Sequence, residues 1–495
     1  MDQTAAEEAR PAVAVSRRGL VLTAALMATF MPAVESTIVA TAMPTIVSDL
    51  GGFSLFSWVF AVYLLAMAVT VPVYGRLADI YGRRIVFFAG TGIFLAGTTL
   101  CGFAGSMTAL ILFRALQGLG AGAIQPIAST IVGDIYTPTE RARVQGYVSS
   151  VFGVSAIAGP LLGAFIVEHL HWSLVFWVNL PVGAASIAMF ARYLREPPGR
   201  REHRIDWLGA ALLTVGVGAA MLALVQARGL GAGGVAAVAA LAVATLALLA
   251  AHERRVPEPI VPFRLWRSRV IAAANLGTFG TGAAMMGVSA FLPAYVQGVM
   301  GRAPAVAGFA LGCQSVSWTL ATFLAARLMI HGSYRLSAAS GALALLIGGS
   351  MLSLLTPQSS IALAAGGSLV MGIGMGLCNP AFLVSIQASV GWGQRGAATG
   401  GNMFMRMLGQ STGAALFGAI VNFGVHARLP DAGDAVNRLL DPELRVALGA
   451  AEEARLTEAF AAAVHNVYLV VIAVAAATLA VALAFPAGLG PRSGR

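Results

Sequence analysis

The stretch GLGAGAIQP, residues 118–126, recurs 254 residues later as GIGMGLCNP, residues 372–380. Three glycines at alternate positions and a closing proline match between the two copies. The same offset relates Arg141 to Arg395. Glycines are frequent in this chain, but one offset shared by two apolar runs and a loop is hard to obtain by chance. We therefore interpret the chain as two tandem copies of one unit.

The composition indicates a membrane protein. The 495 residues are 58% hydrophobic and only 11% charged, which is far too apolar for a soluble protein of this length. Runs of about twenty apolar residues can cross a bilayer as helices, which satisfy their own backbone groups. The short alternating segments of a β-barrel are absent from the sequence. We expect fourteen spans, at 19–43, 56–75, 85–105, 108–132, 145–167, 174–193, 207–226, 231–251, 270–292, 304–326, 336–355, 361–383, 397–423 and 465–486.

The arginines predict the orientation. All 31 basic residues are arginine, and the net charge is +10. With a cytoplasmic N-terminus and alternating sides, 23 arginines lie in cytoplasmic segments, six lie in outer segments, and Arg114 and Arg406 lie within spans. This bias favours cytoplasmic N- and C-termini in a bacterial inner membrane. It also explains the basic charge without a nucleic-acid partner.

The repeat predicts the domain organisation. The first six spans match the last six and begin on the same side, as in parallel repeats related by an axis along the membrane normal. We expect an N-terminal six-helix bundle at 1–193, cytoplasmic connections with two inserted helices at 194–269, and a C-terminal bundle at 270–495 with an outer loop at 424–464. Within that loop, Asp441–Glu443 looks like the start of a short helix. Two facing bundles predict a transporter that binds substrate between them and alternates access.

Six motifs spread along the chain have a recognisable form. They are GRLADIYGRR at 75–84, RALQGLGAGA at 114–123, GVSAIAGPLLG at 153–163, ESTIVATAMPTI at 35–46, WVNLPVG at 177–183 and DWLGA at 206–210. Together they resemble the major facilitator superfamily, and in particular its fourteen-helix drug:proton antiporter branch, over nearly the whole chain. The resemblance implies a proton-coupled exporter of hydrophobic small molecules or drugs. Glu35 stands where the branch usually has Asp, which keeps the acid on a longer arm.

Glu35 is the only charged residue between Arg18 and Asp49. An ionised acid near the bilayer centre costs about 2.5–3.5 kcal/mol. Burial raises a carboxyl pKa and a nearby cation lowers it, so a site that alternates between the two conditions binds and releases protons. Arg114 lies at comparable depth and is the expected partner. A structural ion pair, or an arginine bonded to backbone carbonyls, is the alternative.

The resemblance implies roles for two further sets of residues. A conformational latch is expected at Gly75, Asp79, Gly82, Arg83 and Arg84, and an antiporter motif at Gly153, Gly159, Pro160 and Gly163. The corresponding segment of the second copy, 326–335, has lost the acid, so a latch would be one-sided. Topology alone would also explain the loop charges, and small residues at four-residue spacing are common in membrane bundles.

The cargo site is the weakest signal in the sequence. Methionine and aromatic surfaces adapt to varied apolar ligands, although each such residue is also an ordinary packing residue. The candidates for the substrate cavity are Met31, Tyr63, Gln117, Gln125, Gln314, Trp318, Phe404 and Arg406. One acid against two buried arginines leaves room for an anionic or carbonyl-bearing group of the cargo. The second copy has no acid outside its outer loop, which disfavours strongly dicationic cargo.

Other protein classes fit less well. The histidines fall in loops or at helix ends, so no intramembrane haem or metal pair is expected. A phosphate-binding loop for ATP is absent from the sequence. We expect no enzyme activity, no catalytic or metal residue and no cofactor beyond protons as coupling ion. The expected partners of this monomer are a hydrophobic small molecule and membrane lipid. A dedicated exporter of one native metabolite, or a non-transporting sensor on the same fold, remains an alternative.

Overall fold

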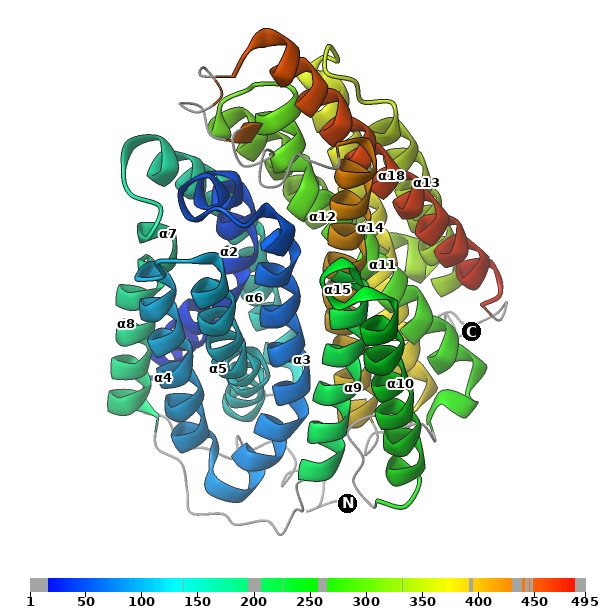
Figure 1. The fold of residues 1–495 in the computed structure, drawn as a ribbon. Coiled ribbons are helices and arrows are strands. Elements are labelled where there is room, and N and C mark those ends of the chain that lie inside the picture. Colours follow the sequence, from blue (N-terminus) through cyan, green and yellow to red (C-terminus); the bar gives the residue numbers. More distant parts are fainter. Residues whose placement is uncertain are drawn as a thin grey trace, which may run out of the picture.

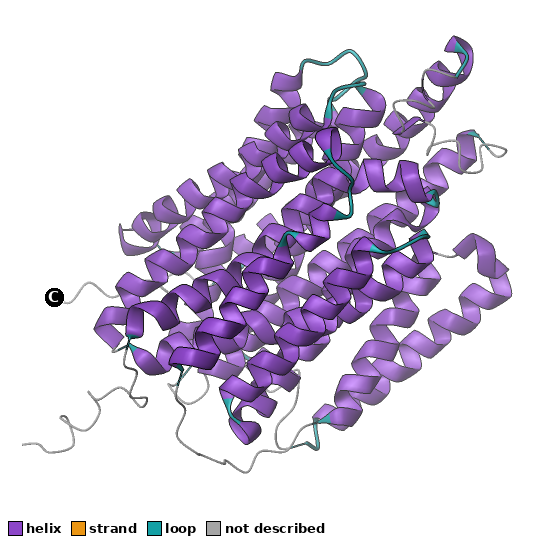
Figure 2. Ribbon diagram, turned by 90° about the vertical axis from the view of Figure 1, so that its left-hand side faces the viewer, coloured by secondary structure: helices purple, strands orange, loops and turns teal. Residues whose placement is uncertain are grey.

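The computed structural model describes residues 17–136, 138–194, 206–225, 227–256, 265–331, 333–390, 395–429, 439–440, 445 and 448–485. All secondary-structure elements in these ranges are helices (Figures 1 and 2). The predicted all-α membrane fold is thereby confirmed.

The helices follow the expected runs. The first unit consists of α2 (Arg18–Leu50), η1 (Phe53–Leu55), α3 (Phe56–Tyr81), α4 (Arg83–Gly102), α5 (Met107–Ile135), α6 (Pro138–His169), α7 (Leu174–Trp177) and α8 (Asn179–Tyr193). The inserted pair consists of α9 (Trp207–Val225) and α10 (Ala227–Glu253). The second unit consists of η2 (Leu265–Arg267), α11 (Arg269–Ala294), η3 (Tyr295–Val299), α12 (Pro304–His331), α13 (Tyr334–Ser353), α14 (Ile361–Ser389), α15 (Arg395–Arg428) and α18 (Ala450–Leu483).

Each of the fourteen apolar runs lies in a helix, the sixth being divided between α7 and α8. Thirteen spans of the described residues are long and apolar enough to cross a membrane. The remaining run lies in α15, which has 34 residues but a more polar sequence. Large apolar side chains stand exposed on the outside of the bundles, among them Val243 and Phe323 at 69% and 67%. Such exposure suits a lipid-facing surface.

Several helix limits differ from expectation, among them those of α2 and α18. α2 continues through Pro44 to Leu50, because its helical hydrogen bonding persists beyond the end of the apolar run. α18 begins at Ala450, so part of the expected outer loop at 424–464 is helical. Glu452 and Glu453 lie in the first turn of α18, where acids are favoured by the helix dipole. The short helix expected from Asp441–Glu443 lies outside the described residues.

The two units repeat their helix packing. α5 packs against α3 and α4, and α14 packs in the same way against α12 and α13. α2 packs against α6 and α8, and α11 correspondingly against α15 and α18. The central helices of both units begin at a serine cap: Ser106 accepts a hydrogen bond from the Ala109 N–H, and Ser360 accepts one from the Ala362 N–H.

The repeated glycines explain this packing. A Cβ at Gly118 would collide with the Tyr63 carbonyl oxygen of α3, and one at Gly372 would collide with the Gln314 carbonyl oxygen of α12. Gly120 and Gly374 stand in the same way against the backbones of α4 and α13. The pattern that revealed the repeat therefore consists of positions where neighbouring backbones come too close for a side chain.

The bundles lie side by side, the first in blue to teal and the second in yellow-green to red (Figure 1). α3 packs against α15, and α6 against α12, across the boundary. The inserted helix α9 packs against α3 and α15 at the same boundary, while α10 packs on α9. The inserted pair thus lies along one side of the boundary between the two bundles.

Hydrogen bonds join the bundles at the end away from the start of α2. Gln297 donates to the Thr41 carbonyl oxygen (3.3 Å), and Asn422 donates to the Ser54 carbonyl oxygen (2.6 Å). Glu168 at the end of α6 accepts from the first turn of α12, at a distance of 2.9 Å from the Ala305 nitrogen. This end of the molecule is therefore held closed in the structure.

Candidate functional site

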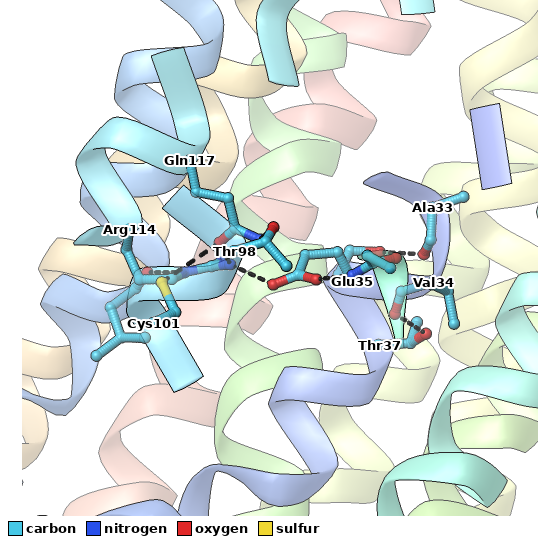
Figure 3. A network of polar contacts seen from close by, with 11 residues as sticks. Ala33, Val34, Glu35, Thr37, Thr98, Cys101, Arg114 and Gln117 are labelled. Atoms are coloured by element: carbon cyan, nitrogen blue, oxygen red, sulfur yellow. Dashed lines mark hydrogen bonds and ion pairs between the residues drawn. The ribbon is translucent and has the colours of Figure 1, made fainter. Parts of the chain in front are cut away.

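A buried polar network lies inside the first bundle, where α2, α5 and α8 meet. Its centre is Glu35, midway along α2, whose side chain is fully buried. Glu35 Oε1 lies 2.6 Å from Nη1 of Arg114, and Arg114 is 1% exposed (Figure 3). The two residues that the sequence placed at comparable depth are therefore an ion pair.

Arg114 is held from four directions. Its Nε donates to the Val59 carbonyl oxygen (3.2 Å), and its Nη1 donates to Gln117 Oε1 (2.7 Å) as well as to Glu35. The guanidinium carbon lies 4.0 Å from the centre of the Tyr63 ring, which adds a cation–π attraction. Both structural contacts that the sequence left open for this arginine, an acid and a backbone carbonyl, are present together.

Gln117 and Tyr63, two of the cavity candidates, belong to this buried network. Gln117 is fully buried, and its Nε2 donates to Thr98 Oγ1 of α4 (2.8 Å). Cys101 lies 3.8 Å from Gln117 Oε1 (Figure 3). Tyr63 is buried, and its hydroxyl has no hydrogen-bond partner among the described residues.

Asn179 is a residue of this network that the sequence analysis did not select. It is the first residue of α8 and is fully buried. Its Nδ2 donates to Glu35 Oε2 with a distance of 2.6 Å. The motif WVNLPVG contained the signal, because an amide at the start of an apolar run is a polar group that needs a partner. Each oxygen of the carboxylate therefore has its own donor.

The antiporter motif on α6 supports the same region. A Cβ at Gly159 would collide with the Thr37 side chain, and one at Gly163 would lie 2.9 Å from the Ile38 carbonyl oxygen. These glycines let α6 lie directly on α2, one turn beyond Glu35. On the other side, Gly153 faces α12 of the second bundle, and the Pro160 carbonyl packs against Gly308 of α12. The motif therefore touches both the acid-bearing helix and the opposite bundle.

The expected latch residues lie at the junction of α3 and α4. Gly82 has a φ of +89°, a conformation that favours glycine, and Gly75 has open space around its Cα. Arg84 donates to the Leu194 and Ala191 carbonyl oxygens at the end of α8, at 3.3 and 2.9 Å. Arg83 is half-buried, and the side chain of Asp79 lies outside the described residues. The latch stays a prediction.

The remaining cavity candidates separate into two groups. Three are buried: Met31 packs close to Gly183 of α8, Phe404 is 2% exposed, and Gln314 donates to the Met375 sulfur (3.4 Å). Gln125, Trp318 and Arg406 are half-buried. The described residues contain no group of three or more His, Cys, Asp or Glu able to hold a metal.

Two repeated helical bundles, with a buried ion pair in one of them, define a multi-pass membrane transporter. A family model described as Major Facilitator Superfamily matches residues 25–414. The chain belongs to this superfamily.

The similar proteins carry transporter names. The chain is 33% identical over 431 residues to Multidrug resistance protein 3 of Bacillus subtilis, covering 85% of this chain and 81% of the relative. It is also 33% identical over 416 residues to the Multidrug transporter protein MdtP of the same organism, covering 82% and 76%. A solved bacterial homologue of the human lysosomal transporter Spinster, inward-facing and unoccupied, superposes with a TM-score of 0.69 at 15% identity, covering 94% and 97%. This last likeness concerns the fold.

Proposed function

We propose that the protein is a proton-coupled antiporter that exports hydrophobic small molecules, drugs among them, by alternating access. The observation that carries the proposal is the fully buried Glu35–Arg114 pair. The names of the similar multidrug transporters support the choice of cargo.

The coupling follows from the energetics of a buried pair. A buried charge that loses its partner is strongly destabilising, because its desolvation is no longer compensated. Any conformation that separates Arg114 from Glu35 therefore requires a proton on the carboxylate or water around it. α6 packs on α2 next to Glu35 and also touches α12. Movement of the bundles against each other would thus strain the pair and change its protonation.

We place the protein in the inner membrane of a bacterium, with both termini in the cytoplasm. The excess of arginine in segments on the side of the N-terminus supports this orientation. In that orientation the end closed by Gln297, Asn422 and Glu168 is the outer end. We infer that cargo approaches this state from the cytoplasm or its adjacent leaflet.

One proton per cycle is energetically sufficient. A driving force of roughly 150 mV supplies about 3.5 kcal/mol per charge. Since each 1.4 kcal/mol is about a factor of ten, a neutral cargo could be concentrated about 300-fold. We propose no cofactor beyond this coupling ion, and a monomer as the working unit.

The test is transport in proteoliposomes with an imposed pH gradient, using a panel of neutral, cationic and anionic fluorescent dyes. Glu35→Gln should abolish gradient-driven transport while the protein still inserts and binds dye. Glu458→Gln, the same change on an exposed side chain of α18, is the matched control and should transport normally. Normal gradient-driven transport by Glu35→Gln would refute the assignment.

The role of Arg114 can be tested separately by measuring proton release when dye binds. Dye added to purified protein in weakly buffered detergent should release protons if binding and protonation compete. Arg114→Ala should reduce this release more than it reduces thermal stability. An equal proton release in the variant and the parent protein would leave Arg114 with a structural role only.

A further inference from the structure

Arg406 is a second arginine inside the membrane-spanning region, and the coupling mechanism does not use it. It lies 11 residues into the 34-residue helix α15, about 16 Å from the start of that helix at 1.5 Å per residue. The side chain is half-buried. An arginine at such depth is costly unless it is paired or faces a polar space.

The residues that the structure describes supply no counter-charge for Arg406. It has no ion pair and no hydrogen bond to any residue that the structure describes. The sequence contains no acid from Arg269 to Pro430. Among the described side chains of the first bundle, Glu35 is the one buried acid, and it is already shared between Arg114 and Asn179. Within the described part of the chain, the positive charge of Arg406 in the second bundle is therefore uncompensated.

Two amides on α15 lie one turn before and one turn after Arg406. On α15, Asn402, Arg406 and Gln410 share one face, because they are four residues apart. Asn402 donates to Thr278 of α11 (2.8 Å), and Gln410 donates to the sulfur of Met285 (3.1 Å). These contacts place Arg406 opposite the intervening turn of α11.

α14 reaches the same turn of α11 with an amide of its own. There a Cβ at Gly282 would lie 2.5 Å from the Arg406 carbonyl oxygen. Asn379 of α14 accepts from Thr281 (3.2 Å) at this level. Gln410 and Asn379 are both half-buried, and both lie within one helical turn of the level of Arg406.

This group lies at a different depth from the proton site. Ser411 donates to the Ala61 carbonyl oxygen of α3, and Arg114 donates to the Val59 carbonyl oxygen of the same helix. Arg406 precedes Ser411 by five residues on α15, and Ala61 lies two residues nearer the cytoplasmic end of α3 than Val59. At 1.5 Å per residue, Arg406 therefore lies about 10 Å nearer the cytoplasmic end than Arg114. A cargo group at Arg406 would thus not displace the Glu35–Arg114 pair directly.

We propose that Arg406, with Gln410 and Asn379 beside it, binds the carboxylate of an amphipathic organic acid carried as cargo. A planar guanidinium binds a carboxylate with two parallel hydrogen bonds, and the amides supply further donors. The proposal rests on the proposed export function and adds the chemical class of one cargo. Export of an anion and entry of a proton each move one positive charge equivalent inward. The membrane potential therefore drives two charges per transport cycle.

The test compares a hydrophobic fluorescent acid, pyrenebutyrate, with its methyl ester, which has nearly the same shape and no charge. Dissociation constants are measured by fluorescence on the purified full-length protein in detergent. The parent protein should bind the acid about tenfold to a hundredfold more tightly than the ester, as expected for charge-assisted hydrogen bonds. Arg406→Gln should remove this preference by weakening the acid alone, and Arg406→Lys should retain part of it.

Arg302→Gln is the matched control, because Arg302 is exposed in the loop before α12, and it should keep the full preference. A purely structural role for Arg406 would weaken the acid and the ester equally, which would overturn the proposal. A preference for the acid over the ester that persists in Arg406→Gln would also overturn the proposal. If that variant does not fold, the ratio in the parent protein decides, and a ratio near one refutes the site.

Failure of this proposal is distinguishable from failure of the export function. Gradient-driven transport of a neutral dye depends on Glu35 and does not require Arg406. A protein that transports the dye but shows no preference for the acid is an exporter without this subsite.

Discussion

Asn179 Nδ2 lies 2.6 Å from the Glu35 oxygen that Arg114 does not bind. The first residue of α8 thereby completes the coordination of an acid on α2. This contact links the sixth span to the proton site, so we expect it to tune the release of the proton.

Asn179→Ala removes one of the donors that stabilise the charged carboxylate of Glu35. A higher pH is then needed for the proton to leave, and the pH profile of gradient-driven transport should move upward by about one unit. Transport is measured in proteoliposomes at a fixed gradient and varied absolute pH. Asn466→Ala, on a half-buried position of α18, is the control, and an unshifted profile in Asn179→Ala would contradict the prediction.

Gly372→Ala should destabilise the second bundle. The added methyl group would collide with the Gln314 carbonyl oxygen, and overpacking of this kind costs about 1–3 kcal/mol. The thermal midpoint of the purified protein should fall. Gly312→Ala on α12 meets open space and should leave the midpoint equal or higher, so an equal fall in both variants would argue against the packing explanation.

Glu168→Gln should shift the population toward an outward-open state. The carboxylate of Glu168 accepts from the Ala305 N–H at the start of α12, where a negative charge is favoured by about 0.5–1 kcal/mol. The open population should rise about twofold to fivefold. Spin labels are placed at positions 105 and 358, in outer loops of the two bundles. Pulsed electron paramagnetic resonance should show a larger population with a longer distance between the two labels.

The control for Glu168 is Asp49→Asn. Asp49 accepts from the Trp172 indole at 2.6 Å within one bundle, so its loss should not change the distance between the bundles. An unchanged distribution in Glu168→Gln would show that this contact does not hold the outer end closed.

Chelation should leave transport intact. The described residues offer no cluster of metal ligands, and the sequence lacks a phosphate-binding loop. Gradient-driven dye transport should be the same with and without a chelator of divalent cations and without ATP. A requirement for either would contradict coupling to protons alone.

Much of the architecture could be predicted from the sequence because membrane-spanning helices are read from local composition. The fourteen runs and the repeat centred on Gly118 and Gly372 both survive in the structure. The limits of α2 and α18 were wrong, since an apolar run shows where lipid can be tolerated and not where helical hydrogen bonding ends. The pairing of Glu35 with Arg114 followed from depth alone.

Asn179 and Thr98 could not be assigned to the site in the same way. Their spacing along the chain carries no information about which side chains face each other across helices. The separation of buried Gln117 from half-buried Arg406 also depended on how neighbouring helices cover each residue.

By itself the sequence determined that the chain spans a membrane as helices, that it consists of two copies of one unit, and that one acid lies deep within the first. These properties depend on local hydrophobicity, on the offset between repeats and on the solitary charge. Only the tertiary structure decided that both oxygens of this acid have donors and that Arg406 has none. The physical reason is that pairing and burial depend on the approach of helices distant in sequence, which side-chain volume and backbone contact control.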